Sequence, residues 1–123
     1  MPALPNDVLI VEDDPIIMLD LEDTIQALGV KLTRAAANVA TALDMIAERV
    51  PDFALLDVGL LDENSFAVAS RLATLQIPFV FVTGYGSEKV PTTFADRPKL
   101  SKPFSTDALL TVMQRLGDAE CQT

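Results

Sequence analysis

Carboxylates follow directly on two of the most apolar runs in the sequence. Glu12 and Asp13 come after the run Val8–Val11, and Asp57 comes after Phe53–Leu56. Carboxylates that gather at one place repel one another unless a cation lies among them. Oxygen ligands without cysteine or histidine suit a hard ion such as Mg²⁺, which also bridges carboxylate to phosphate. These positions therefore predict a site for a divalent cation.

A hydroxyl and an ammonium group occupy similar positions later in the chain. Thr83 ends the apolar run Ile77–Val82, and Lys102 follows a short apolar stretch near Leu100. An aspartate can attack phosphorus and form an acyl phosphate. A lysine, a hydroxyl and Mg²⁺ are the groups that the equatorial oxygens of a transferring phosphoryl group require. If these positions meet, phosphoryl transfer to a carboxylate is the chemistry that they support.

The composition excludes several other kinds of site. None of the 123 residues is a histidine, which rules out Ser-His-Asp and Cys-His nucleophiles and histidine-containing zinc sites. The formal net charge of −9 argues against binding nucleic acid or an anionic membrane by long-range attraction. The single cysteine, Cys121, cannot form a disulfide within the chain, so we expect a reducing, cytoplasmic environment. We expect no signal peptide, and no apolar run approaches the ~20 residues of a membrane span.

Short apolar runs alternate with segments of helical period, a pattern typical of a parallel α/β sheet. The five runs are Val8–Val11, Val30–Ala35, Phe53–Leu56, Ile77–Val82 and the stretch near Leu100. The continuous apolar character of the stronger runs indicates strands that helices cover on both faces, whereas the second and fifth runs are weak, as expected for the two edges of such a sheet. Right-handed crossovers and the chain length favour a flavodoxin-like doubly wound sheet with strand order 2-1-3-4-5. In such a sheet a site forms beyond the carboxyl ends of strands one and three, where Glu12, Asp13 and Asp57 stand.

Apolar stripes at helical spacing predict the helices that pack on this sheet. The stripes are Ile17, Leu21, Ile25, Leu28; Val39, Leu43, Ile46, Val50; Phe66, Ala69, Leu72; and Leu109, Val112, Met113, Leu116. The third helix is expected to start at about Asn64 and the last to follow Ser105. The segment Gly84–Arg97 contains Pro91 and few apolar residues, so the fourth helix is expected to be short or irregular. We interpret residues 1–123 as one domain, with a core at about 7–116 and a frayed tail at 117–123.

Capping residues mark the ends of the first two helices. Asp14 precedes Pro15, and an aspartate N-cap followed by proline at the first helical position is a preferred helix start. We therefore predict that Asp14 caps the first helix rather than binding the cation. Gly29 is expected to end that helix, and Asn38 is expected to cap the second one.

Four motifs, each at the end of a predicted strand and in this order, resemble the response-regulator receiver domain, the aspartate-phosphorylated module of two-component signalling. They are Val11–Pro15, Leu55–Val58, Phe81–Gly84 and Lys102–Phe104. The resemblance covers roughly Asp7 to Leu116. The stretch Pro78–Gly86 further resembles a receiver subgroup nicknamed FATGUY. Members of that subgroup are typically stand-alone and associated with sensor histidine kinases of the HWE and HisKA2 types.

The resemblance implies a role for each residue of the predicted site. It makes Asp57 the phosphoacceptor and a metal ligand, Asp13 a direct ligand of Mg²⁺, and Glu12 a second acidic position that acts through water. The backbone carbonyl of Gly59 would complete the protein ligands of the metal. Glu12 at the rim of the sheet could instead be an ordinary solvated carboxylate.

The resemblance also implies that Thr83 and Lys102 contact the phosphoryl group. Each has an ordinary alternative, since Thr83 could be a plain β-branched strand residue and Lys102 a surface lysine. The position of Thr83 beside Gly84, where backbone can approach a ligand, favours the contact.

Three positions depart from the usual receiver pattern. Leu61 and Ser65 stand near the places of a common proline and glycine, so the loop after Asp57 is expected to differ in shape. Lys99 stands where receivers carry the aromatic residue that switches on the fifth strand. We take Tyr85, the only tyrosine, as the candidate replacement switch; the alternative is that its ring packs over the sheet edge.

The sequence thus predicts a stand-alone receiver that accepts a phosphoryl group from a histidine kinase or phosphotransfer protein and slowly hydrolyses it. It would signal through contacts with a downstream protein or act as a phosphate sink, and would not be an enzyme acting on a separate substrate. One alternative is a phosphorylation-independent receiver-like binding module, although such modules have usually lost the acceptor, an acidic residue or the lysine. Another is an aspartyl-phosphate hydrolase of the haloacid dehalogenase type, which needs a second aspartate where Gly59 stands. A flavodoxin is disfavoured, because the acidic turn at Glu12 would repel a flavin phosphate.

Overall fold

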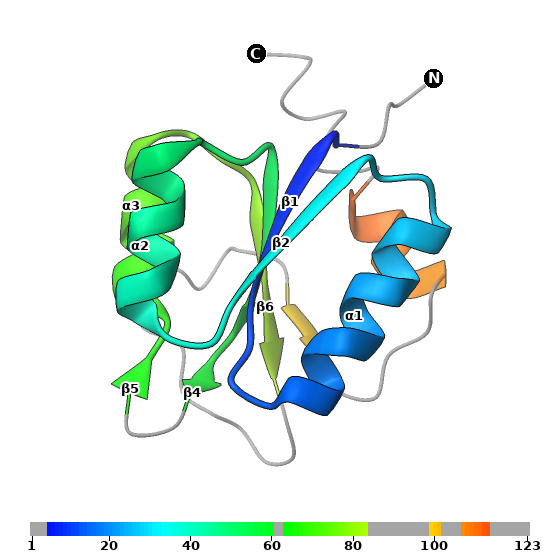
Figure 1. Ribbon diagram of the computed structural model, residues 1–123, viewed down its shortest axis with the longest axis horizontal. Helices are drawn as coiled ribbons and strands as arrows, with labels where there is room; N and C mark the ends of the chain where they lie inside the picture. Colours follow the sequence, from blue (N-terminus) through cyan, green and yellow to red (C-terminus); the bar gives the residue numbers. More distant parts are fainter. Residues whose placement is uncertain (1–4, 61–62, 84–98, 102–106, 114–123) are drawn as a thin grey trace.

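A parallel β-sheet between two layers of helices forms the body of the protein (Figure 1). The computed structural model describes residues 5–60, 63–83, 99–101 and 107–113. The sheet has the order β2-β1-β3-β6-β7. Its strands are β1 (Asp7–Val11), β2 (Leu32–Ala36), β3 (Phe53–Asp57), β6 (Phe79–Thr83) and β7 (Lys99–Ser101). The predicted α/β fold with a parallel sheet is confirmed, and the apolar stretch near Leu100 supplies the three-residue strand β7.

Successive residues of the central strands point into two separate cores, because side chains alternate between the faces of a sheet. One core contains Leu9, Val11, Ala54, Leu56, Phe79 and Phe81. The other contains Val8, Ile10, Phe53, Leu55, Val80 and Val82. Both faces of these strands are buried, which is why their sequences are continuous apolar runs and do not alternate between apolar and polar residues. The edge strand β2 is mostly half-buried, and its sequence is correspondingly weaker.

Among the described residues, two helices cover each face of the sheet. The helices α2 (Val39–Glu48) and α3 (Phe66–Thr74) pack on the first core, and α1 (Pro15–Ala27) and the helical residues 107–113 pack on the second (Figure 1). The sequence analysis placed Val50 in the apolar stripe of the second helix, and this was wrong. Val50 is 47% exposed, because α2 has already ended at the extended residue Arg49.

The predicted caps are confirmed. The side chain of Asp14 accepts hydrogen bonds from Ile16 N and Ile17 N, at 2.9 and 3.3 Å, and Asn38 Oδ1 accepts one from Thr41 N at 2.8 Å. Gly29 has φ 108° and ends α1. A left-handed residue at this position allows the Schellman motif, in which Gly29 N donates to Gln26 O and Val30 N donates to Ile25 O.

A small antiparallel pair lies between β3 and α3 and was not predicted. The strand β4 (Gly59–Leu60) pairs with β5 (Glu63–Asn64), with Gly59 opposite Asn64. The third helix therefore starts at Phe66 and not at about Asn64. Phe66 is only partly buried, with its ring edge-on to Phe81 at 5.9 Å between centroids.

Several sequence-based expectations fall on residues outside the described ranges. They concern the fourth helix within Gly84–Arg97, the start of the last helix after Ser105, and the tail at 117–123. Within the ranges that are described, no helix is long and apolar enough to cross a membrane.

Candidate functional site

The carboxyl ends of β1 and β3 lie side by side and place three carboxylates together. Val11 pairs with Leu56 in the parallel register of the two strands, so Glu12 and Asp57 are the next residues on neighbouring strands. Glu12 N donates to Ala36 O at 3.0 Å, which extends the pairing of β1 with β2 by one residue. The backbone that carries Glu12 is therefore held by the sheet and not by a loop.

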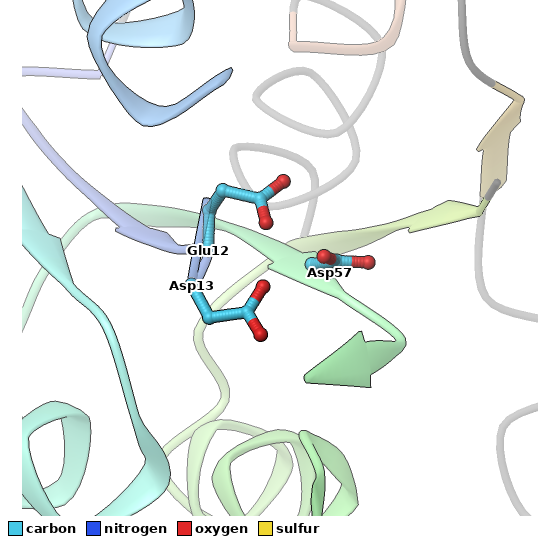
Figure 2. Close-up of side chains that lie close together, drawn as sticks. All are labelled: Glu12, Asp13 and Asp57. Atoms are coloured by element: carbon cyan, nitrogen blue, oxygen red, sulfur yellow. The ribbon is translucent and has the colours of Figure 1, made fainter. Parts of the chain in front are cut away.

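Glu12, Asp13 and Asp57 each offer a carboxylate oxygen, and these three oxygens lie within 4.8 Å of one another. Figure 2 shows the two consecutive residues at the end of β1 beside Asp57 at the end of β3. Glu12 is 1% exposed and Asp57 is 7% exposed, whereas Asp13 is half-buried. The cluster thus opens to solvent mainly on the side of Asp13.

Asp14 lies next to this cluster in sequence but serves the helix. Its carboxylate caps α1, as predicted, and its backbone N donates to Glu12 Oε2 at 3.2 Å. This hydrogen bond helps fix the orientation of the Glu12 carboxylate. Of the three acidic residues in this turn, Glu12 and Asp13 therefore belong to the cluster and Asp14 caps α1.

The donor set fits a hard divalent cation. Three carboxylates whose oxygens lie within 4.8 Å of one another, two of them buried, cost free energy unless positive charge compensates them. All the ligand atoms are oxygens, the type that Mg²⁺ prefers, and Mg²⁺ completes its coordination with water and with phosphate oxygens. Asp13, which is half-buried, leaves the cluster in contact with water on one side.

The other predicted site residues fall in different parts of the fold. Thr83 is the last residue of β6, next to Val82, which pairs with Asp57, so it stands at the same edge of the sheet as the cluster. Gly59 begins β4, two residues after Asp57. Lys102 and Tyr85 lie outside the described residues, and Ser101, which precedes Lys102, pairs with Thr83 in the register of β6 and β7.

Val58 is a part of the site that the sequence analysis did not single out. It is buried, and its backbone N donates to Val82 O at 3.1 Å, which continues the β3–β6 pairing past Asp57. Asp57 is therefore held on both sides by sheet backbone. The apolar character of Val58 was the available signal, since it extends the run Phe53–Leu56 beyond the aspartate.

Comparison with known proteins agrees with this geometry. A family model for the response regulator receiver domain matches residues 8–114. The polar-differentiation response regulator DivK of Brucella anthropi is 32% identical over 124 residues, covering 94% of this chain and 100% of DivK. The phyllosphere-induced regulator PhyR of Methylorubrum extorquens is 32% identical over 108 residues, covering 82% of this chain. This chain spans only 39% of PhyR and 57% of PdtaR, a transcriptional regulatory protein of Mycobacterium tuberculosis.

A solved structure resembles the whole fold. The solution structure of SdrG from Sphingomonas melonis Fr1 superposes with a TM-score of 0.82 at 41% sequence identity. The match covers 94% of this chain and 98% of SdrG. The likeness therefore includes both helical layers as well as the sheet.

Proposed function

Because this chain belongs to the family of response regulator receiver domains, we propose that it accepts a phosphoryl group on Asp57 in a Mg²⁺-dependent reaction. The observation that carries the proposal is the cluster of Glu12, Asp13 and Asp57 at the ends of two adjacent strands. A buried aspartate beside two other carboxylates destabilises the fold by charge repulsion, so it is better explained as an acceptor site in which a bound cation compensates the charge.

In the proposed reaction an Asp57 oxygen attacks the phosphorus of a phosphohistidine on a partner protein. The new oxygen–phosphorus bond forms as the phosphorus–nitrogen bond breaks, and the leaving imidazole nitrogen keeps the electron pair and takes a proton from solvent. Asp13 and Asp57 would hold Mg²⁺ directly, Glu12 through water, and Gly59 through its carbonyl. When bound, the cation supplies positive charge that balances the carboxylates and the phosphoryl oxygens.

Thr83 and Lys102 are proposed to contact the phosphoryl oxygens. The position of Thr83 at the end of β6, beside the residue that pairs with Asp57, supports its part. Slow hydrolysis returns Asp57 to its free form when water attacks phosphorus and the bond to the Asp57 oxygen breaks. The protein is thus a phosphoacceptor that assists its own turnover.

The partners follow from the same assignment. We propose a sensor histidine kinase, of the HWE or HisKA2 type, or a histidine phosphotransfer protein as the donor, in the cytoplasm. The output would be a contact with a downstream protein or the draining of phosphate from a kinase. The full-length matches to DivK and SdrG support a receiver that works as a stand-alone module.

Incubation with acetyl phosphate, followed by intact-mass measurement, tests the function. The parent is expected to gain the mass of one phosphoryl group with Mg²⁺ and not with a chelator. Asp57→Asn is expected to gain none. Asp14→Asn is the matched control, because it removes a neighbouring carboxylate while asparagine still caps α1.

The same measurement addresses the phosphorylation-independent binding module. That alternative predicts no mass gain in the parent under any of these conditions. Equal labelling of the parent and of Asp57→Asn would show that another residue is the acceptor.

A further inference from the structure

The N-termini of three described helices differ in a way that bears on the site. Asp14 and Asn38, the N-caps of α1 and α2, are extended, with ψ 114° and 169°, and both accept hydrogen bonds from the first turn. Ser65, at the N-cap of α3, has φ −90° and ψ 11° and makes no side-chain capping bond. Serine is among the preferred N-cap residues, so the missing cap results from the conformation and not from the residue type.

The hydroxyl of Ser65 is also buried without a partner. Ser65 is 0% exposed, and its Oγ is the one side-chain atom of the described residues that is fully buried with no hydrogen bond. Buried polar groups are almost always paired, because an unmade hydrogen bond in the core is unfavourable. The arrangement at Ser65 therefore costs free energy in the state that the structure shows.

A short series of contacts connects Ser65 to Asp57. Val58 N is bound to Val82 O, the next residue is Gly59, and Gly59 pairs with Asn64 in the β4–β5 pair. Asn64 directly precedes Ser65. One strand pair therefore connects the backbone after Asp57 to Ser65, the residue that directly precedes α3.

The conformation of Ser65 decides whether its hydroxyl can cap α3. Rotation about ψ of Ser65 moves its side chain and the preceding strand β5 together relative to α3. An extended ψ like those of Asp14 and Asn38 brings a serine hydroxyl to the backbone N–H of the second or third helical residue, here Ala67 or Val68. The hydroxyl can therefore leave the core and cap α3 only if β5 moves.

We propose that Ser65 is a two-state cap coupled to Asp57: its hydroxyl is buried and unpaired in the unphosphorylated protein and caps α3 after phosphorylation. The coupling rests on the proposed function. A phosphoryl group on Asp57, and a cation held by the Gly59 carbonyl, act on the residues that lead into β4. They favour the state in which the β4–β5 pair has shifted, and the new cap bond removes the penalty of the buried hydroxyl.

Hydrogen exchange at single amides in the full chain tests the coupling. With acetyl phosphate and Mg²⁺, exchange at Ala67 or Val68 is expected to slow about fivefold in the parent, the effect of one typical N-cap bond. Ser65→Ala is expected to gain the phosphoryl mass normally and to show no such slowing. Ser65→Gly is a second variant without the hydroxyl, and glycine is tolerated at N-caps.

A matched pair of substitutions tests the unphosphorylated state. Ser65→Ala is expected to lower the unfolding equilibrium constant about fivefold, because it removes an unpaired buried hydroxyl. Asn38→Ala, the same kind of change at a working cap, is expected to raise that constant about fivefold. A Ser65→Ala protein destabilised like Asn38→Ala would show that the hydroxyl is already paired, and would overturn the proposal.

The outcomes separate the two proposals. Absence of a mass gain in the parent overturns the proposed function and the coupling with it. A normal mass gain with unchanged exchange at Ala67 and Val68, or with the same slowing in Ser65→Ala, overturns the two-state cap alone.

Discussion

Buried aspartates lie at both ends of the sheet, and their surroundings differ in charge. At the carboxyl end, Asp57 lies among Glu12 and Asp13. At the amino end, Asp7 is paired with two arginines: Arg34 Nε is 3.0 Å from Asp7 Oδ1, and Arg49 Nε is 3.1 Å from Asp7 Oδ2. The carboxyl end gathers carboxylate oxygens that a dissolved divalent cation can bind, and at the amino end the carboxylate is paired with arginines.

The network at the amino end has a structural role, because its charged side chains are paired with one another or with the backbone. Arg34 Nη2 also donates to Asp7 Oδ2, and the guanidinium donates to Met45 O and Arg49 O at the end of α2. Asp52 Oδ2 accepts from Asp7 N at 3.1 Å. The network joins β1, β2 and the segment after α2, so we expect its removal to change the stability of the fold and not the proposed phosphorylation of Asp57.

The largest expected effect is that of Asp7→Ala. The substitution leaves two arginines without their carboxylate, and breaking a buried pair in this way costs about 3–5 kcal/mol. Urea unfolding measures the loss, and intact-mass labelling of the folded protein is expected to remain normal. If Asp7→Ala abolished labelling while the protein stayed folded, the two ends would not be separable.

Mg²⁺ is expected to have the next largest effect. A cation that binds only the folded form is expected to stabilise the chain by about 2.7 kcal/mol at 100 times its Kd. Thermal unfolding with and without Mg²⁺ is expected to show this rise in the parent and in Asp14→Asn. Asp13→Asn is expected to lose most of it, and an undiminished rise in that variant would place the cation elsewhere.

The two arginines at the amino end are expected to contribute unequally. The side chain of Arg49 is 66% exposed and that of Arg34 is 16% exposed. Solvent weakens the first pair, so Arg49→Ala is expected to cost about 0.2–1 kcal/mol. Arg34→Ala removes a bidentate pair and two bonds to backbone carbonyls and is expected to cost more; equal losses in urea would contradict this reading of the network.

An effect as small as that of Arg49→Ala is expected at Gln76, which follows α3 with φ 62°. Ile77 N donates to Leu72 O and Gln76 N to Ala73 O, so Gln76 holds the same left-handed position after α3 that Gly29 holds after α1. Gln76→Gly is expected to stabilise the protein by about 0.5–1 kcal/mol, since glycine adopts positive φ without steric cost. Gly29→Ala is the reciprocal control and is expected to destabilise it.

The sequence predicted the carboxyl end better than the amino end for a physical reason. Apolar runs indicate where the strands lie. The carboxyl ends of parallel strands lie at the same edge of the sheet, so the residues that follow each run come together there. Asp14 and Asn38 were predictable because a cap is a local interaction. The Asp7–Arg34 pair joins residues that are 27 apart, and no pattern within either strand indicates it.

The region between Asp57 and α3 was the least predictable. Strands of two residues are too short to show alternation, so the β4–β5 pair left no periodic signal. Ser65 looks like an ordinary N-cap in the sequence, and its buried hydroxyl depends on how β5 enters α3. The sequence pointed to this region only through Leu61 and Ser65, which stand near the places of a common receiver proline and glycine.

The placement of Arg34 has a consequence for solubility. It is the middle residue of β2, the edge strand that pairs with β1 only among the described strands, and its charge points inward to Asp7. An open edge offers unpaired backbone groups to another chain, and an inward charge is one of the ways in which proteins make such an edge a poor template. A strand from a second molecule that paired with β2 would cover the partly exposed guanidinium and add no hydrogen bond to it. The residue that balances Asp7 is therefore also expected to make this edge a poor template for a further strand.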